Sequence, residues 1–293
     1  MTFCLLSDFD GVWTDQIEEA GAVRRAFIAE ASRVLARSEA ELSQDFDAFL
    51  AAALADPADN GWAPGGELTA FVDEDPLLAT ASVAGWIDRG GVHPNAAGWR
   101  DGLAQAGFGS VNEFANACFG PATLQHRASG GHQLVAGARA ALDELLALDV
   151  ELVIVSNSHA SKLEALFADA GIDTGRELRV IGDAKKWALG DGRDLTELDS
   201  RFVRLDRPHY RRILEDVRPD LVVGDVLSLD LALPSMLRFV GALDPTLQLA
   251  LRKHPHTPSW TLGAGRAGVY DHTIEHVREL PELVRAGRRC PPQ

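Results

Sequence analysis

The chain has 293 residues, of which 46% are hydrophobic and 24% charged, the balance of an ordinary globular protein. Its formal net charge of -15 argues against a nucleic-acid backbone or an anionic membrane surface as partner, although a metal ion can reverse the field at one site and admit a phosphate. The length allows one large domain or a core with one sizeable insert, and no segment approaches a membrane-spanning helix.

Three widely spaced cysteines, Cys4, Cys118 and Cys290, lie in no metal-ligand spacing. We expect them to be reduced thiols, as in a cytoplasmic protein. The apolar start is too short for a signal peptide, and Asp8 interrupts it. The sequence therefore predicts a cytoplasmic protein.

The first predicted strand, residues 3–6, is followed at once by two carboxylates. Asp8 and Asp10 lie two residues apart, with Gly11 directly behind them. Two like charges at a strand end repel each other and lose hydration. Such a pair indicates that a cation binds there, or that one carboxylate carries a proton in a reaction.

Residues 16–130 show a different pattern. Residues 17–55 are Ala-rich and helical in period, and GWAPGGE at 61–67 interrupts them. The expected core positions in this helical stretch are Leu35, Leu42, Phe46, Phe49 and Leu50. We find no strong strand signal before residue 130. The sequence therefore predicts a helical cap over 16–130, inserted into a core made of 1–15 and 131–293.

Strand and helix patterns alternate after the insert. Further buried strands are expected at 151–155, 178–181 and 221–223, and helices at 132–148, 161–170 and 209–217. This alternation predicts an α/β fold, a doubly wound parallel sheet with helices on both faces.

Polar residues follow these strands where ligands of open α/β sheets bind. Ser156 and Asn157 follow the second strand, and Asp225 the fourth, with Asp230 five residues later. If the strands are neighbours, Asp8, Asp10 and Asp225 converge. An oxygen-only ligand set favours Mg²⁺ over zinc. One aspartate could then attack phosphorus while a second protonates the leaving oxygen.

Three segments together resemble a known family. DFDGVWT, VIVSNS and GDVLSLD, in this order, are similar to motifs one, two and four of the haloacid-dehalogenase (HAD) superfamily of phosphohydrolases. The resemblance covers the core, and the insert stands where the superfamily carries a helical cap between motifs one and two. Because dehalogenases of this superfamily lack the second aspartate of motif one, Asp10 favours phosphoryl transfer over carbon–halogen cleavage.

The resemblance also implies roles for single residues. Asp8 would be the nucleophile and Asp10 the general acid/base. Mg²⁺ would be held by Asp8, the backbone carbonyl of Asp10, and Asp225. Asp230 would orient a lysine or a metal-bound water, and Ser156, with Asn157 beside it, would bind phosphate.

The third motif departs from the family pattern. Members usually carry Lys-Pro before the helix that precedes motif four, where this chain has Arg207-Pro208. Lys185 and Lys186 follow the third strand instead. We favour Lys186 as the lysine that reaches phosphate, with Arg207 as a second phosphate cation. Lys185 or an arginine in this role stays an alternative.

The sequence thus predicts a Mg²⁺-dependent phosphomonoesterase that hydrolyses a small phosphorylated metabolite through an aspartyl-phosphate intermediate. A phosphomutase on the same core and a non-catalytic relative that binds a phosphorylated ligand are the alternatives. We expect a monomer or a homodimer, and no nucleic acid or membrane as partner. The insert shows no specificity motif, so the identity of the substrate stays open.

Two further patterns favour plain structural interpretations. GAGRAG at 263–268 matches a nucleotide-binding spacing, but too little chain follows it, so we predict a turn. His272 and His276 are four residues apart, and we interpret them as the solvated face of a helix.

Overall fold

The computed structural model describes residues 2–131 and 133–289. The chain forms two compact units, one of Met1–Asp15 with Gln133–Gln293 and one of Gln16–His132. In the first unit, Thr14 and Leu134 form an antiparallel bridge, so the chain leaves this unit and returns to it at neighbouring places. Among the described helices, none has the length and apolar content needed to cross a membrane.

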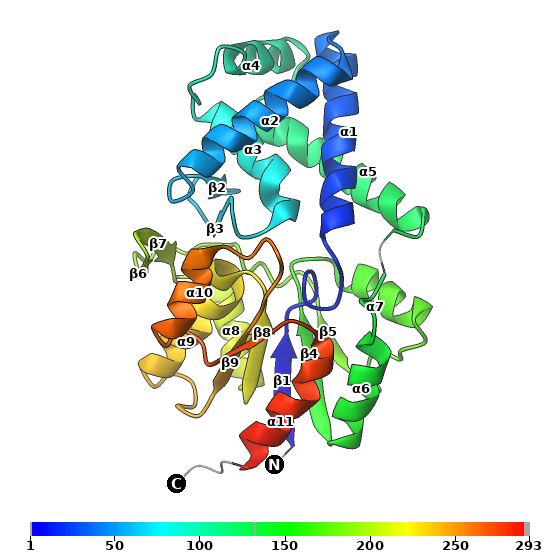
Figure 1. The fold of residues 1–293 in the computed structure, drawn as a ribbon, viewed down its shortest axis with the longest axis vertical. Helices are drawn as coiled ribbons and strands as arrows, with labels where there is room; N and C mark the ends of the chain where they lie inside the picture. Colours follow the sequence, from blue (N-terminus) through cyan, green and yellow to red (C-terminus); the bar gives the residue numbers. More distant parts are fainter. Residues whose placement is uncertain (1, 132, 290–293) are drawn as a thin grey trace. The chain divides into compact units, whose positions relative to one another are not determined.

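The first unit is built on a six-stranded sheet in the order β10-β9-β8-β1-β4-β5 (Figure 1). Its strands are β1 (Phe3–Ser7), β4 (Val150–Val155), β5 (Arg179–Ile181), β8 (Leu221–Gly224), β9 (Gln248–Arg252) and β10 (His272–Ile274). Every pairing between these strands is parallel. The predicted fold class, a doubly wound parallel sheet, is confirmed, and all four predicted strands are present.

Helices cover the sheet. They are α6 (Ala138–Ala147), α7 (Ala160–Asp169), α8 (Pro208–Val217), α9 (Ala232–Phe239), α10 (Ser259–Arg266) and α11 (Leu280–Arg289). Leu142 of α6, Phe167 of α7 and Val284 of α11 pack with Leu5 and Leu152 of the strands in one buried cluster. In Figure 1, α8, α9 and α10 lie on one side of the central strands, and α6 and α7 on the other. The burial of the strands explains their nearly continuous apolar runs.

Several sequence expectations for this unit are wrong. The helix expected from residue 132 begins only at Ala138, while His132 itself lies outside the described residues. His272 belongs to strand β10, and His276 precedes a 3₁₀ turn (η3, Val277–Glu279), so the two do not share a helix face. GAGR at 263–266 is the end of α10 rather than a turn. Position 265 requires glycine, because a Cβ there would stand 2.4 Å from the Tyr270 ring.

The second unit is helical, with α1 (Ile17–Leu35), α2 (Glu39–Ala55), a 3₁₀ turn (η1, Pro76–Leu78), α3 (Ala79–Asp88), α4 (Ala96–Gln105) and α5 (Val111–Ala128). It also contains one antiparallel pair of short strands, β2 (Gly61–Trp62) and β3 (Ala70–Phe71), each two residues long. The stretch at 17–55 is two helices, because Ala36 adopts a left-handed backbone and Ser38 caps α2 in a capping box with Glu41.

An aromatic core holds the helical unit together. Phe27 stacks on Trp99 at 5.6 Å between ring centroids and meets Phe46 and Phe114 edge-on or tilted. Leu42, Phe46 and Phe49 are buried as predicted, and Leu35 and Leu50 pack partly buried against them. The apolar stripe read from the sequence is therefore the core of this unit.

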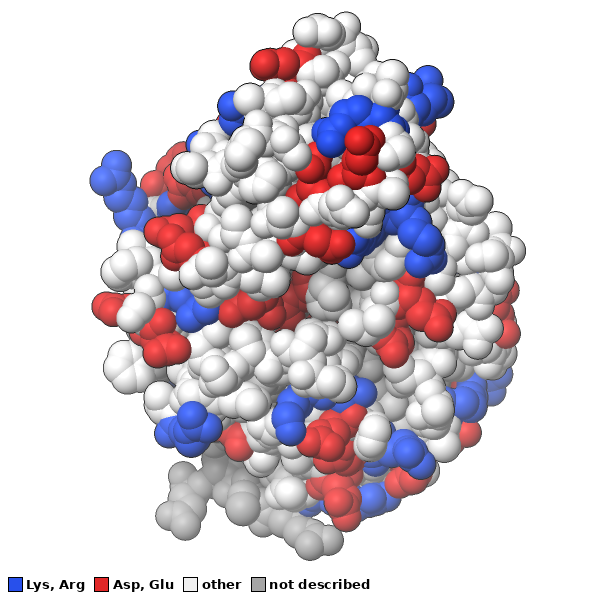
Figure 2. Space-filling model, turned by 45° about the horizontal axis from the view of Figure 1, so that its top comes forward, with Lys and Arg blue, Asp and Glu red and all other residues white. Residues whose placement is uncertain are grey.

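The surface carries both signs of charge. On the face drawn in Figure 2, Lys and Arg side chains lie scattered among Asp and Glu side chains rather than gathered into one basic surface. Of the three cysteines, Cys4 and Cys118 are buried free thiols, and Cys290 lies outside the described residues.

Candidate functional site

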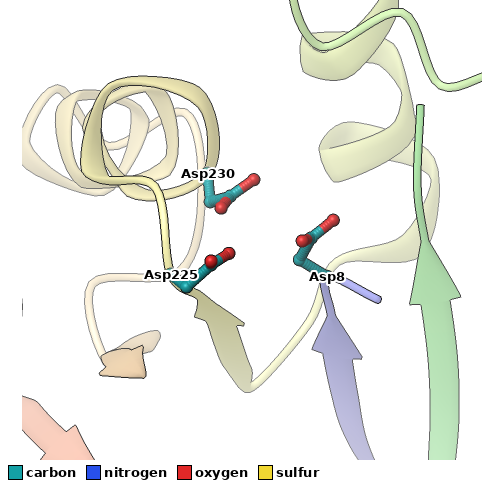
Figure 3. A group of neighbouring side chains, drawn as sticks. All are labelled: Asp8, Asp225 and Asp230. Atoms are coloured by element: carbon teal, nitrogen blue, oxygen red, sulfur yellow. The ribbon is translucent and has the colours of Figure 1, made fainter. Parts of the chain in front are cut away.

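The carboxyl ends of β1 and β8 bring two of the predicted site residues together. Ser7 of β1 pairs with Val223 of β8, and the Asp8 N–H donates to the Val223 carbonyl at 2.8 Å. Asp8 and Asp225 therefore follow adjacent strands at the same level. With Asp230 they form a buried group whose carboxylate oxygens lie within 4.8 Å of one another (Figure 3).

Two glycines make this close approach possible. A Cβ on Gly11 would stand 1.9 Å from Oδ2 of Asp225, and Gly11 has a φ of +81°, which side chains disfavour. A Cβ on Gly224 would stand 2.2 Å from the Cβ of Asp230. The glycines of DFDG and GDVLSLD are thus required by the positions of two carboxylates.

Lys186 reaches the same place from the loop after β5. Its ammonium donates to Oδ1 of Asp8 and, at 2.6 Å, to Oδ1 of Asp230. It also lies 5.8 Å from the centre of the Tyr210 ring. Lys186 is buried, whereas Lys185 is exposed. Of the two lysines that the sequence left open, the structure brings Lys186 to the carboxylates.

Burial and charge shift the acidity of this ion pair. Burial raises the pKa of Asp8 well above its ordinary value, and the charges of Asp230 and Asp10 add to this, while Lys186 opposes it. Burial alone would lower the pKa of Lys186, but Asp230 and Asp8 raise it beyond its ordinary value. Lys186 is therefore charged, and the crowded carboxylates make a second positive charge favourable.

Asp230 is held from both sides. Its Oδ1 accepts from Lys186, and its Oδ2 accepts from the Val226 N–H at 3.0 Å. The hydroxyl of Tyr210, on α8, donates to the Asp230 carbonyl at 2.9 Å. Both carboxylate oxygens of Asp230 are therefore engaged, one of them by Lys186. Tyr210 is a member of this site that the sequence reasoning missed.

Asp10 is surrounded by the segment after β4. The hydroxyls of Ser156 and Ser158 donate to its Oδ2 at 3.0 and 3.1 Å. The ammonium of Lys162, on α7, lies 3.9 Å from its Oδ1. Ser156 was expected to bind phosphate, yet its hydroxyl donates to Asp10 here. Ser158 and Lys162 were not singled out, although Ser158 repeats the hydroxyl of Ser156 two residues on.

Asn157 and Arg207 both contact the loop that carries Lys186. Oδ1 of Asn157 accepts from the Lys186 N–H at 2.7 Å. The buried guanidinium of Arg207 donates to the carbonyls of Lys186, at 2.6 Å, and Arg204, at 3.0 Å. The sequence reasoning did not foresee these contacts, and the phosphate-binding role of both residues stays a prediction.

His254 is a further residue that the sequence reasoning missed. It follows β9, and its Nε2–H donates to the Gly11 carbonyl at 2.7 Å, while Nε2 lies 3.8 Å from Oδ2 of Asp225. Burial, with the charges of Arg252 and His256, lowers the pKa of His254 to about 4. The neutral ring therefore ties the loop after β1 to the strand end after β9. A signal for the preceding strand was present in QLALR at 248–252, whose apolar run is as long as LVV at 221–223, but the sequence reasoning did not predict a strand there.

The donor set fits a hard divalent cation. Asp8 and Asp225 offer carboxylate oxygens from buried side chains, and no sulfur ligand stands among the described residues of this cluster. Oxygen-only sites of this kind suit Mg²⁺. A buried group of carboxylates is costly unless positive charge offsets their repulsion, and Lys186 supplies one such charge.

The chain is similar to known proteins only among solved structures. No protein-family model matches the chain, and no curated protein matches it. Among solved structures it is similar to YfnB from Bacillus subtilis bound to magnesium, with 13% identity, a TM-score of 0.48, and 97% and 99% of the two chains covered. It is also similar to a 2-haloacid dehalogenase from Pseudomonas syringae pv. tomato, with 16% identity, a TM-score of 0.47, and 98% and 99% covered.

A third similar structure is CbbY from Rhodobacter sphaeroides in complex with phosphate, with 16% identity, a TM-score of 0.46, and 96% of each chain covered. Identities this low say nothing of the chemistry of this chain. The features of the chain that bear on its chemistry are the parallel sheet and the carboxylates at its strand ends.

Proposed function

We propose that the chain is a Mg²⁺-dependent phosphomonoesterase of the HAD type that acts on a small phosphorylated metabolite. One observation supports this most. Asp8, at the end of the central strand, lies between the ammonium of Lys186 and the carboxylate of Asp225. This is a carboxylate placed where a cation and an electrophile can both reach it.

Asp8 is the proposed nucleophile. Its carboxylate oxygen attacks the phosphorus atom of the substrate, the bond to the leaving oxygen breaks, and the phosphoryl group remains on Asp8 as an acyl phosphate. Mg²⁺, held by Asp8, the backbone carbonyl of Asp10 and Asp225, would offset negative charge on the phosphoryl oxygens and favour ionised Asp8. Lys186, oriented by Asp230, holds positive charge beside the attacking oxygen.

Asp10 is the proposed general acid and base. Protonated, it gives its proton to the leaving oxygen; ionised, it takes a proton from the water that hydrolyses the acyl phosphate. The hydroxyls of Ser156 and Ser158 fix the direction of its carboxylate. For Ser156 to bind a phosphoryl oxygen as well, its hydroxyl must turn from Asp10 to the substrate.

Turnover of an aryl phosphate, with Mg²⁺ and after chelation, tests the proposal. We expect release of inorganic phosphate only with Mg²⁺, and loss of turnover in Asp8→Asn. Asp216→Asn is the matched control, because this aspartate is 72% exposed and pairs only loosely with Arg212 at 3.8 Å. Equal rates in Asp8→Asn and the wild type would refute the assignment of the nucleophile. Product analysis with a sugar phosphate separates hydrolysis from a mutase, which retains the phosphoryl group in its product.

A further inference from the structure

The loop that carries Lys186 has an unusual backbone. Asp183 and Lys185 both adopt left-handed conformations, with φ of +51° and +48°, which residues other than glycine disfavour. Gly182, just before them, lies so close to α7 that a Cβ would stand 2.2 Å from the Ala160 nitrogen. A loop of this shape persists only where its surroundings hold it.

Backbone hydrogen bonds hold the first half of this loop against the end of β4. The Asp183 N–H donates to the Ser158 carbonyl at 2.9 Å, and the Ala184 N–H donates to the Ser156 carbonyl at 3.0 Å. The same two serines bind Asp10 through their hydroxyls. The loop and Asp10 therefore share one support.

Side chains hold the second half of the loop, and both act on the peptide groups of Lys186. Asn157 accepts from its N–H at 2.7 Å, and Arg207 donates to its carbonyl at 2.6 Å. Arg207 is 1% exposed, and its Nε donates to the Arg204 carbonyl at 3.0 Å, so its planar guanidinium is fixed at two points.

We propose that Asn157 and Arg207 are positioning residues that clamp the backbone of Lys186. A lysine side chain is a flexible four-carbon stem, so the place of its ammonium depends on where its backbone is fixed. With both peptide groups held, the ammonium meets Asp8 and Asp230 together. The consequence for catalysis rests on the proposed function, whereas the clamp itself is a property of the fold.

Chemical labelling of lysines tests the clamp without any activity measurement. The protein is treated with an amine-reactive ester, and peptide mass spectrometry compares Lys186, buried, with its exposed neighbour Lys185 as internal reference. We expect the Lys186-to-Lys185 labelling ratio to rise about tenfold or more in Arg207→Met, because local opening exposes the ammonium. Arg211→Met is the matched control, since Arg211 is a half-exposed residue of α8 paired with Glu215.

Asn157→Ala provides a second variant, because Asn157 is only partly buried and its replacement spares the packing around α8. It should also raise the labelling ratio, and it decides the matter if Arg207→Met does not fold. A ratio within about twofold of the wild type in the folded variants, with Arg211→Met unchanged, overturns the clamp.

Kinetics then connect the clamp to the reaction. For an aryl phosphate, we expect kcat to fall about 10²-fold in Arg207→Met with KM within twofold, because a displaced ammonium weakens the chemical step more than binding. A loss confined to KM would instead make Arg207 a phosphate ligand and overturn the catalytic consequence of the clamp. If the wild type does not turn over the ester while labelling behaves as expected, the proposed function fails and the clamp stands.

Discussion

The two units of the molecule bury carboxylates in opposite ways. In the helical unit, Asp45 accepts hydrogen bonds from Arg37 at 2.8 Å, Asn95 at 2.5 Å and Trp99 at 3.0 Å. In the α/β unit, Asp8 faces two further carboxylates, Asp225 and Asp230, within 4.8 Å. Asp45 is surrounded by three donors, whereas Asp8 has the ammonium of Lys186 beside two other carboxylates.

The acidity of the two groups follows this contrast. Burial would raise the pKa of Asp45, but the bonds from Trp99, Asn95 and Arg37 lower it below its ordinary value. Burial raises the pKa of Asp8, and its acidic neighbours raise it further. Asp45 is thus satisfied in its ionised form within the protein. The carboxylates at the strand ends lack such a set of donors, and under the proposed function a bound cation would supply positive charge there.

Removing the charge of Lys186 should have the largest effect. In Lys186→Met, Asp8 and Asp230 are left facing each other without their shared ammonium, and we expect a loss of about 3–5 kcal/mol in the free energy of unfolding. Urea denaturation measures this loss. Lys185→Met should stay within about 0.5 kcal/mol of the wild type, because Lys185 is exposed. Adding Asp8→Asn to Lys186→Met should recover part of the loss, since one of the two repelling charges is then gone.

Asp45→Asn should come next, with a loss of about 2 kcal/mol, because an amide turns one acceptor into a donor amid donors. Hydrogen exchange read by mass spectrometry should place the loss of protection in the helical unit. Asp47→Asn serves as control, since Asp47 is 59% exposed and pairs with Arg24 at the surface. If hydrogen exchange in this unit is the same in Asp45→Asn as in the wild type, Asp45 does not stabilise the helical unit.

The sequence predicted the strands whose burial requires a run of apolar residues. Strands β1, β4 and β8 are covered on both faces, so their residues form nearly continuous apolar runs, and Asp8 and Asp225 follow the runs of β1 and β8. Strand β10 is three residues long and pairs with β9 alone. Such an edge strand has too few residues to show a period, so His272 was placed on a helix instead.

The candidate site was predictable only where it follows a strand. Asp8 and Asp225 could be found from their position, whereas the contacts of Lys186 depend on a loop with two left-handed residues. Backbone of this kind leaves no periodic pattern. The partners of Asn157 and Arg207 are backbone groups of that loop. Their residue types suit phosphate equally well, so the sequence did not indicate these contacts with the loop.

Magnesium should stabilise the α/β unit and leave the helical unit unaffected. A ligand that binds only the folded state raises the free energy of unfolding, by about 2.7 kcal/mol at one hundred times its Kd. We expect added Mg²⁺ to stabilise the wild type and Asp45→Asn alike, and to have little effect on Asp225→Asn. Thermal unfolding at increasing Mg²⁺ measures this. Equal stabilisation of Asp225→Asn would place the ion elsewhere.

The pH dependence of the free energy of unfolding should show a smaller effect, which comes from the lowered pKa of Asp45 in the helical unit. A carboxyl whose pKa is lower in the folded protein than the unfolded value of about 3.9 stabilises the fold above that pH, and the contribution is lost as pH falls through the folded pKa. The difference in free energy of unfolding between the wild type and Asp45→Asn should therefore be constant from about pH 7 to 5 and shrink below about pH 4, by at most about 1.4 kcal/mol per pH unit. Urea denaturation at each pH measures it. A difference that grew on acidification would mean that Asp45 is held in its protonated form, and the contrast with Asp8 would disappear.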